Sequence, residues 1–410
     1  MIAAAAAACA TSTSISTSTS TATPTPTPTP TASSARTATS TAISTAPPTA
    51  TPTSTAASPR GLIWSHPDAA ADALAARVLS SLSLEQRIAQ LVIAYPPQAD
   101  VPVETGGVIL LGKMLRDPGA LRARVQDLQR RARVPLLVAV DLEGGALNRL
   151  RAVPTMAALP SARDLGGEGA WEAEAWGRRA GLDLVALGVN TSLGPVFDLA
   201  DSGFMHETGR SLGGDPVRVA RLGRAFARGL ASAGVVAIGK HYPGYGAVDA
   251  SSDRALVVVE RSAQEIARQQ AAFVEAGDRL AGVMLANVGY TAYGSVPAVF
   301  SSDLVARAHL SGFLAVTDDL AVPSLVPAAG GDAAEVVRRA FLAGNDLLLT
   351  TAPVDWERGV DPRAVVAALV RDRPELSARV EESALRVLRV KARAGILGAV
   401  PGELARSDGR

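Results

Sequence analysis

Short apolar runs rich in β-branched residues recur along most of this chain and alternate with stretches of helical periodicity. The predicted strands lie at 91–95, 106–111, 135–141, 188–196, 235–241, 282–288, 312–318 and 345–350. Helical patterns lie between most of them, at 119–132, 169–186, 215–233, 262–277 and 333–343. Near-continuous apolar strands that alternate with helices are typical of a parallel sheet covered by helices. Eight such repeats predict an α/β fold, a single closed TIM-like (β/α)8 barrel, rather than an open doubly wound sheet.

Local signals near both ends of this region support helices there. Ser83 and Gln86 have the spacing of a capping box that opens a helix. A last helix is predicted at about 375–394, and we expect its apolar face to pack on the barrel wall. That face carries Val380, Ala384, Val387 and Leu388. No Gly-x-Gly-x-x-Gly follows the first predicted strand, which argues against a dinucleotide-binding fold.

The first sixty residues have a different composition from the rest. Positions 11–58 are almost entirely Thr, Ser, Pro and Ala, interrupted only by Ile15, Arg36 and Ile43. Such a stretch cannot bury enough apolar surface to offset its chain entropy, so we predict a disordered tether. The predicted domain boundaries are therefore 1–60 for the leader and linker, 61–400 for the barrel and 401–410 for a frayed tail.

The opening MIAAAAAACA resembles the end of an export signal, although it lacks a charged n-region. Two interpretations stay open. The chain is a lipoprotein whose start codon was assigned too late, with Cys9 as the lipidated residue, or Cys9 is incidental in a disordered Ala-rich start. The first predicts an extracytoplasmic protein, secreted or lipid-anchored, on a tether that could reach roughly 150 Å.

Charge and composition exclude several function classes. The formal net charge is +1, so charge gives no argument for nucleic acid as a partner. No apolar run in the predicted barrel reaches the roughly 18 residues of a membrane span. One cysteine excludes an intrachain disulfide framework and a Cys-rich zinc site. No pair of histidines has metal-ligand spacing, and neither a metal nor an organic cofactor is expected. The four histidines are His66, His206, His241 and His309.

Polar residues follow several of the predicted strands. In a (β/α)8 barrel these strand ends form the rim on which active sites are built. The rim residues predicted in this way are Asp141, Lys240, His241, Asn287, Asp318 and Asp319. At least two carboxylates and two cations therefore converge. A carboxylate in that place serves as a nucleophile, a base, a metal ligand or a hydroxyl acceptor, and topology alone does not choose among these roles.

Six motifs, in order, resemble segments of glycoside hydrolase family 3, in particular its bacterial β-N-acetylhexosaminidase branch. The motifs are VAVDLEGGALNRL (138–150), GVNTSLGPVFDLA (188–200), GRSLGGDP (209–216), KHYPGYG (240–246), VTDDL (316–320) and RVEESALRVLRVKARAGIL (379–397). The resemblance covers about 75–397. The Pro-Gly-x-Gly loop of KHYPGYG favours the N-acetylglucosaminide branch over the β-glucosidase branch. The implied substrate is a carbohydrate, and a tethered extracytoplasmic location fits peptidoglycan-type saccharides or muropeptides.

The resemblance also implies roles for individual residues. Asp318 corresponds to the nucleophile of the family's retaining mechanism, whereas Asp319 fits a structural role. Asp141 corresponds to the acceptor for hydroxyls of the terminal sugar. The residues that correspond to further sugar-binding positions are Arg149, Arg210, Lys240 and His241.

These binding assignments have structural alternatives. Arg149 and Arg210 could instead form internal ion pairs with Asp141, Asp198 or Glu143, and both roles can hold at once. His241 could be a buried histidine whose hydrogen bonds are satisfied inside the protein. Glu143 is expected to be structural.

The chain departs from the family pattern at the acid/base. The family's Asp-Ser-His segment, on the loop after the fifth strand, falls on Ser251, Ser252 and Asp253, so both members of the Asp-His dyad are replaced. Three further departures lie at the predicted rim. Tyr245 stands in place of a His, Ala146 in place of an Arg, and Asn287 in place of a His.

Two functions follow from these departures, and a third class remains. In the first, the chain is a β-N-acetylhexosaminidase-like O-glycosidase in which Asp253, or nearby Asp249, donates the proton, although the adjacent Arg254 argues against a raised carboxyl pKa. In the second, the chain is a degenerate family member that keeps the sugar pocket but cleaves slowly or not at all, since general acid catalysis contributes typically 10²–10⁴-fold. The third class is a structural cell-wall protein without saccharide binding.

Overall fold

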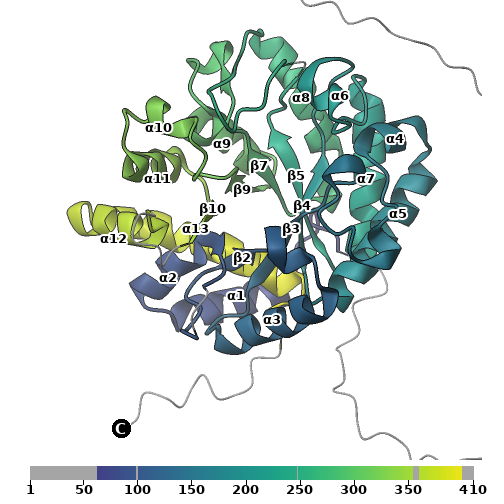
Figure 1. Cartoon of the computed structure of the whole chain (residues 1–410). Helices are drawn as coiled ribbons and strands as arrows, with labels where there is room; N and C mark the ends of the chain where they lie inside the picture. The colour runs from purple at the N-terminus through teal and green to yellow at the C-terminus, as the bar shows by residue number, and fades with distance from the viewer. Residues whose placement is uncertain (1–61, 98–99, 247, 354–359, 399–410) are drawn as a thin grey trace, which may run out of the picture. The chain divides into compact units, whose positions relative to one another are not determined.

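The computed structural model describes residues 62–97, 100–246, 248–353 and 360–398 (Figure 1). Cys9, the Ser/Thr/Pro-rich segment and the tail at 401–410 lie outside the described residues. The lipid anchor, the tether and the frayed tail therefore stay predictions. Within the described part of the chain, no helix is both long enough and apolar enough to span a membrane.

Eight parallel strands form the main sheet, and each overlaps one of the eight strands predicted from the sequence. They are β1 (Val92–Tyr95), β2 (Gly107–Ile109), β3 (Leu137–Asp141), β4 (Thr191–Val196), β5 (Val236–Tyr242), β7 (Gly282–Leu285), β9 (Leu314–Thr317) and β10 (Leu348–Pro353). Their order in the sheet is β10-β1-β2-β3-β4-β5-β7-β9. A parallel bridge between Val316 and Leu347 joins the two end strands, where Thr317 N donates to Leu347 O at 2.9 Å. The predicted TIM-like barrel is therefore confirmed.

Helices surround this sheet in the order expected of a (β/α)8 barrel (Figure 1). They are α1 (Ala69–Ser80), α2 (Leu84–Gln90), α3 (Pro118–Arg131), α4 (Ala162–Gly167), α5 (Ala170–Ala186), α6 (Gly203–Glu207), α7 (Pro216–Ser232), α8 (Ala263–Glu275), α9 (Ser302–Leu310), α10 (Leu325–Ala328), α11 (Ala333–Ala343), α12 (Pro362–Asp372) and α13 (Leu376–Arg393). The predicted capping box opens α2, because Ser83 and Gln86 exchange side-chain-to-backbone hydrogen bonds of 3.0 and 3.3 Å.

The last helix does more than pack on the barrel wall. Val380, Ala384 and Leu388 pack in the outer core between barrel and helices, as predicted. Val387 and Val390 instead join the apolar cluster inside the barrel, together with residues at the strand starts such as Leu314 and Leu347. Helix α13 therefore closes the N-terminal end of the barrel, and the polar chemistry is left to the opposite end.

A two-stranded parallel sheet at the other end was not predicted. It pairs β6 (Val258–Val259) with β8 (Gly289–Tyr290). Strands of two residues are too short to give a period-2 pattern in the sequence. The pairing ties the long connection after β5 to the connection after β7, and both connections border the site described below.

Candidate active site

A cavity that is open to solvent lies at the carboxyl ends of the barrel strands. Its floor is apolar and is formed by Ile109, Met284 and Leu349, which lie in β2, β7 and β10 and belong to the apolar cluster inside the barrel. Its walls carry the polar side chains. Seven of the predicted site residues line this one cavity, whereas the predicted rim residue Asn287 does not: they are Asp141, Arg149, Arg210, Lys240, His241, Asp253 and Asp318.

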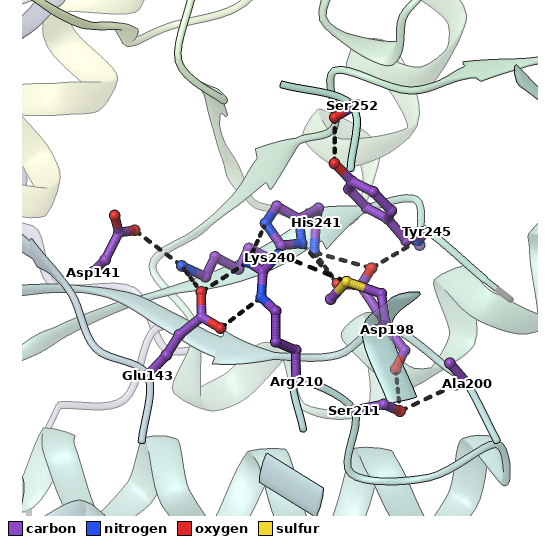
Figure 2. A network of polar contacts seen from close by, with 12 residues as sticks. Asp141, Glu143, Asp198, Ala200, Arg210, Ser211, Lys240, His241, Tyr245 and Ser252 are labelled. Carbon is purple, nitrogen blue, oxygen red and sulfur yellow. Dashed lines mark hydrogen bonds and ion pairs between the residues drawn. The ribbon is translucent and has the colours of Figure 1, made fainter. Parts of the chain in front are cut away.

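Four charged side chains form a compact network on one wall (Figure 2). Lys240 Nζ lies 2.9 Å from Asp141 Oδ1 and 2.9 Å from Glu143 Oε1. Arg210 makes a bidentate pair with Glu143, with Nε at 2.7 Å and Nη2 at 2.8 Å. Glu143 therefore serves both cations, which agrees with its predicted structural role and with the internal ion pair expected as an alternative for Arg210.

The network fixes the charges of its members. Burial alone would raise the pKa of Glu143, but Lys240 and Arg210 hold that pKa well below its ordinary value. Burial alone would lower the pKa of Lys240, but Asp141 and Glu143 raise it above its ordinary value. The Lys240 side chain, only 2 % exposed, thus stays a cation that points its donors at two carboxylates.

His241 is held by a fully buried carboxylate that the sequence did not single out. Its Nδ1 lies 2.7 Å from Asp198 Oδ2, and its Nε2 lies 3.3 Å from Arg210 Nη2. A guanidinium only donates, so Nε2 accepts and the proton sits on Nδ1, which donates to Asp198. Asp198 also accepts from the backbone N–H groups of His241 and Tyr245. His241 is thus a buried, satisfied histidine that nevertheless faces the cavity.

Asp318 follows β9 and keeps part of its surface in the cavity. Its backbone N–H donates to Leu285 O at 3.0 Å, which fixes the residue to the end of β7. Its Oδ1 accepts from Asp319 N at 2.8 Å, and no hydrogen bond to the other oxygen occurs in the described part of the chain. Burial raises the pKa of Asp318 above its ordinary value, while the Asp319 N–H and the Lys240 cation oppose the rise.

The neighbouring Asp319 is occupied structurally. It accepts hydrogen bonds from Ala321 N at 3.0 Å, from Thr351 N at 2.9 Å and from Thr351 Oγ1 at 2.5 Å. Asn287 Nδ2 donates to the Asp319 carbonyl at 2.8 Å. The Asp319 carboxylate thus shapes the turn after β9, so that of these two neighbours only Asp318 presents an oxygen without a hydrogen bond in the described part of the chain.

The remaining wall is more open. Arg149 contacts Asp141 through Nε at 3.5 Å, and half of its side chain, 50 %, is exposed. Ser251 and Asp253 line the cavity, with Asp253 exposed at its edge. Tyr245 fixes this loop through a hydrogen bond between its hydroxyl and that of the buried Ser252 (Figure 2).

Sequence reasoning missed parts of this arrangement. Asp249, named as a second proton donor, is exposed and is not among the residues that line the cavity. The sequence suggested Asp198 only as an ion-pair partner for an arginine, whereas in the structure Asp198 orients His241. The sequence signal that could have pointed to Asp198 is its position, since it is a carboxylate in the segment that follows a barrel strand. In the described ranges, no group of three or more His, Cys, Asp or Glu side chains is placed to hold a metal ion.

Barrel and cavity together place this chain in a known class. Residues 83–390 match the model of the glycosyl hydrolase family 3 N terminal domain, and the chain belongs to this family. It is 37% identical over 261 residues to a β-hexosaminidase of Bordetella avium, a match that covers 60% of this chain and 73% of that protein. It is 38% identical over 260 residues to a β-hexosaminidase of Thiobacillus denitrificans, which covers 60% of this chain and 70% of that protein.

Solved structures show the same likeness. A family 3 β-N-acetylglucosaminidase from Paenibacillus sp. str. FPU-7 superposes with a TM-score of 0.69 and 30% identity, over 77% of this chain and 63% of that one. A β-N-acetylhexosaminidase from Beutenbergia cavernae superposes with a TM-score of 0.68 and 31% identity, over 75% of this chain and 98% of that one. This chain thus spans less than two thirds of the Paenibacillus protein and nearly all of the Beutenbergia protein.

Proposed function

We propose that this chain is a retaining glycosidase that acts on terminal β-linked N-acetylhexosamine, with Asp318 as its nucleophile. The observation that carries the proposal is the position of Asp318, a cavity-facing carboxylate that shares one pocket with the Lys240–Asp141 pair. The names of the related β-hexosaminidases support the choice of sugar.

The geometry suits nucleophilic attack by Asp318. The Asp319 N–H occupies Oδ1 and orients the carboxylate, so the other oxygen is available to the anomeric carbon. As that oxygen forms a bond to the anomeric carbon, the glycosidic C–O bond breaks and its electron pair leaves with the aglycone oxygen. Water then attacks the glycosyl ester, and the sugar leaves with its anomeric configuration retained.

Sugar recognition is assigned to the charged wall. Asp141 is oriented by Lys240 and by Arg149, and its carboxylate can accept from vicinal hydroxyls. Arg149 and Arg210 offer guanidinium donors to hydroxyl and N-acyl oxygens, and His241 borders the same space. Because Glu143 neutralises part of the positive charge, the pocket fits a neutral sugar rather than an anion.

The proposed proton donor differs from the buried carboxyl that usually serves as a general acid. Asp253 is the proposed non-standard acid/base, since it lines the cavity and occupies the position of the family's lost His. It is exposed, however, whereas a carboxyl that donates a proton at neutral pH is normally buried. This exposure favours a second candidate function, a sugar-binding family member that cleaves natural glycosides very slowly or not at all.

The biological setting rests on the sequence alone. We infer an extracytoplasmic protein that acts on peptidoglycan-type saccharides or muropeptides, attached to the membrane only through a lipid on Cys9 if that cysteine is modified. Labelling with a radioactive fatty acid, compared between the full chain and Cys9→Ser, tests the anchor. Incorporation that survives the substitution would contradict it.

The catalytic proposal is tested with 2,4-dinitrophenyl N-acetyl-β-glucosaminide, whose leaving group needs no protonation. We expect dye release by the wild-type protein and a loss of at least about 10³-fold in Asp318→Asn, because the nucleophile is removed. Calorimetry with N-acetylglucosamine should show similar affinity for both proteins. Equal dye release by both would refute the role of Asp318, and absence of sugar binding by both would favour the structural cell-wall class.

A further inference from the structure

A second pocket lies at the opposite end of the barrel from Asp318, where the strands begin; we call it the basal pocket. Its apolar side includes Ala281, directly before β7, Leu314, the first residue of β9, and Val390 of α13. These three belong to the apolar cluster inside the barrel, and Trp64, which also lines the pocket, packs against that cluster. The basal pocket shares no lining residue with the cavity of Asp318, so a ligand bound here is separate from the sugar.

The other side of the basal pocket is cationic. It carries His309, near the end of α9, and three arginines of α13, Arg386, Arg389 and Arg393. Their spacing of three and four positions puts the three arginines on one face of the helix. No carboxylate is among the described residues that line the pocket. A ligand here therefore meets apolar side chains on one side and cations on the other.

The fully buried Asp346 fixes one half of the cationic side. Its Oδ2 lies 2.8 Å from His309 Nε2, and its Oδ1 lies 3.1 Å from Arg386 Nη1. Arg386 also pairs with Glu382 at 2.6 Å, so its guanidinium is largely occupied. Because Nε2 donates to the carboxylate, the proton of a neutral His309 ring sits there, and Nδ1 makes no hydrogen bond in the described part of the chain. His309 thus keeps one oriented ring nitrogen for a ligand.

The other half of the cationic side has donors to spare. Arg389 Nε and Arg393 Nη2 lie 3.4 and 3.5 Å from the same oxygen of Asp72, which is long for a hydrogen bond. Arg393 Nη1 donates to Trp64 O at 3.2 Å, whereas Arg393 Nε and Trp64 Nε1 are buried donors with no hydrogen-bond partner among the described residues. Unmet donors of this kind cost free energy, so an acceptor group in the pocket that these side chains line would be favoured.

The charges of this region point to an anion. The three arginines of the basal pocket pair with Asp72 and Asp346, while Glu382 and Arg379 add one charge of each sign to the same network. One positive charge is therefore left over. Guanidinium groups match the geometry of carboxylates and phosphates, but a phosphomonoester presents three terminal oxygens and a carboxylate only two. A phosphomonoester can therefore contact two guanidinium groups and a histidine at once.

We propose that the basal pocket binds a phosphomonoester, with its terminal oxygens on Arg389, Arg393 and His309 and its organic part against Trp64 and Val390. This site is separate from the proposed glycosidase activity and does not rest on it. Two sources share this chemistry, a soluble phosphomonoester and the head group of a lipid such as phosphatidic acid. The lipid is a natural source here because the described chain begins at Leu62, so the segment that carries Cys9 joins the barrel beside the basal pocket.

Trp64 gives a direct signal, because an anion beside the indole ring changes its fluorescence. The full chain is titrated with butyl phosphate, Trp64→Phe identifies the part of the signal that comes from the basal pocket, and calorimetry measures the binding itself. We expect a saturable Trp64 signal that persists in saturating N-acetylglucosamine, since the two sites share no lining residue. A signal that N-acetylglucosamine abolishes would assign the phosphate to the sugar cavity and overturn the proposal.

Arg389→Gln tests the cationic side. The Arg389 side chain is 44 % exposed, so the variant should fold, which circular dichroism checks. Loss of a charge-assisted hydrogen bond should raise the Kd for butyl phosphate at least about tenfold. Arg371→Gln is the matched control, because Arg371 is exposed on α12 and does not line the pocket, and its Kd should equal that of the wild-type protein. Equal Kd values in all three proteins, or butyrate bound as tightly as butyl phosphate, would overturn the proposal.

Vesicles of phosphatidylcholine, with and without phosphatidic acid, separate the two sources. Binding that requires phosphatidic acid, that butyl phosphate competes away and that Arg389→Gln loses assigns the basal pocket to a lipid head group. Binding of butyl phosphate without binding to either vesicle assigns it to a soluble phosphomonoester. Absence of both kinds of binding overturns the proposal and leaves the proposed role of Asp318 untouched.

Discussion

The Nδ1 atom of His241 lies 2.7 Å from an oxygen of the fully buried Asp198. The same carboxylate accepts from the backbone N–H groups of His241 and Tyr245, so one acidic side chain fixes both a ring and the start of the loop after β5. The opposite ring nitrogen of His241 faces Arg210 at 3.3 Å. Asp198 is therefore a positioning residue, which acts through His241 and not on the sugar itself.

Removing the charge of Asp198 should disturb this arrangement. Asp198→Asn lets the side chain donate as well as accept, and the His241 ring loses the partner that holds its proton on Nδ1. We expect kcat/KM for dinitrophenyl N-acetylglucosaminide to fall on the order of 10–100-fold, the size of loss that follows removal of the carboxylate that orients a metal-binding histidine. The NMR signals of the His241 ring should show a change in which ring nitrogen carries the proton. Glu207→Gln on α6, an exposed position, is the control and should change neither. An unaltered His241 signal in Asp198→Asn would contradict the positioning role.

The pH dependence of cleavage should reflect the buried nucleophile. Asp318 attacks as a carboxylate, so activity rises with pH as the group ionises. Because burial raises its pKa above the ordinary 3.8, the acid limb of kcat/KM should lie above that value. No alkaline limb is expected near neutrality with the dinitrophenyl substrate, since the pKa values of Lys240 and Tyr245 are raised by their surroundings. A natural β-linked disaccharide, whose leaving oxygen must be protonated, is the comparison substrate, and an alkaline limb near pH 7 with it would reveal a working general acid.

The bond between Tyr245 and Ser252 should hold the loop that carries Asp253. Tyr245→Phe keeps the ring against His241 and removes the hydroxyl that contacts Ser252. We expect a loss of about 1 kcal/mol in stability, typical of one hydrogen bond, and faster hydrogen exchange over 248–256. Tyr293→Phe is the control, because Tyr293 stacks with Arg307 away from the cavity. Exchange over 248–256 that matches the wild-type protein would show that the loop is held by other contacts.

Lys391 in α13 should give the barrel a measurable pH-dependent stability. Its side chain is fully buried, with Nζ 2.7 Å from Gln90 Oε1, and burial lowers its pKa from 10.5 to about 7. Between these pH values the unfolded chain binds a proton that the folded chain does not. The free energy of unfolding should therefore rise with pH, by at most about 1.4 kcal/mol per pH unit from this group.

Denaturant titrations from pH 7 to pH 10 check this effect. Lys391→Met should remove most of this rise in the free energy of unfolding. The variant should gain most over the wild-type protein at pH 7 and below, where the wild-type protein holds a buried cation. Lys113→Met, at an exposed position, is the control and should keep the wild-type slope. If the free energy of unfolding changes with pH equally in both variants, the pH dependence comes from groups other than Lys391.

The barrel was predictable because its strands carry their own signal. Buried parallel strands such as 135–141 and 235–241 are continuous apolar runs, and helical patterns between them leave few alternatives to a closed barrel. The gathering of Asp141, Lys240 and Asp318 followed from the same logic, since the carboxyl ends of parallel strands meet at one end of the barrel.

What the sequence did not reveal depends on packing between distant segments. Asp198 holds His241 across 43 positions of the chain, and no local pattern distinguishes it from other carboxylates. Val387 enters the barrel interior because α13 crosses the strand starts, which a one-face helical pattern does not specify. The exposure of Asp253 is set by the loop that Tyr245 anchors through Ser252, and such loop geometry has no periodicity to read.

Trapping of the covalent intermediate tests the central claim most directly. A 5-fluoro analogue of dinitrophenyl N-acetylglucosaminide slows both steps, and the scarcity of proton-transferring groups should make the glycosyl ester persist further. Mass spectrometry of the intact protein, followed by peptide mapping, locates the adduct. We predict one fluorinated sugar per chain, bound to the peptide that contains Asp318 and absent from Asp318→Asn. Release of dinitrophenol without any adduct, or an adduct on another carboxylate such as Asp141 or Asp253, would contradict the account.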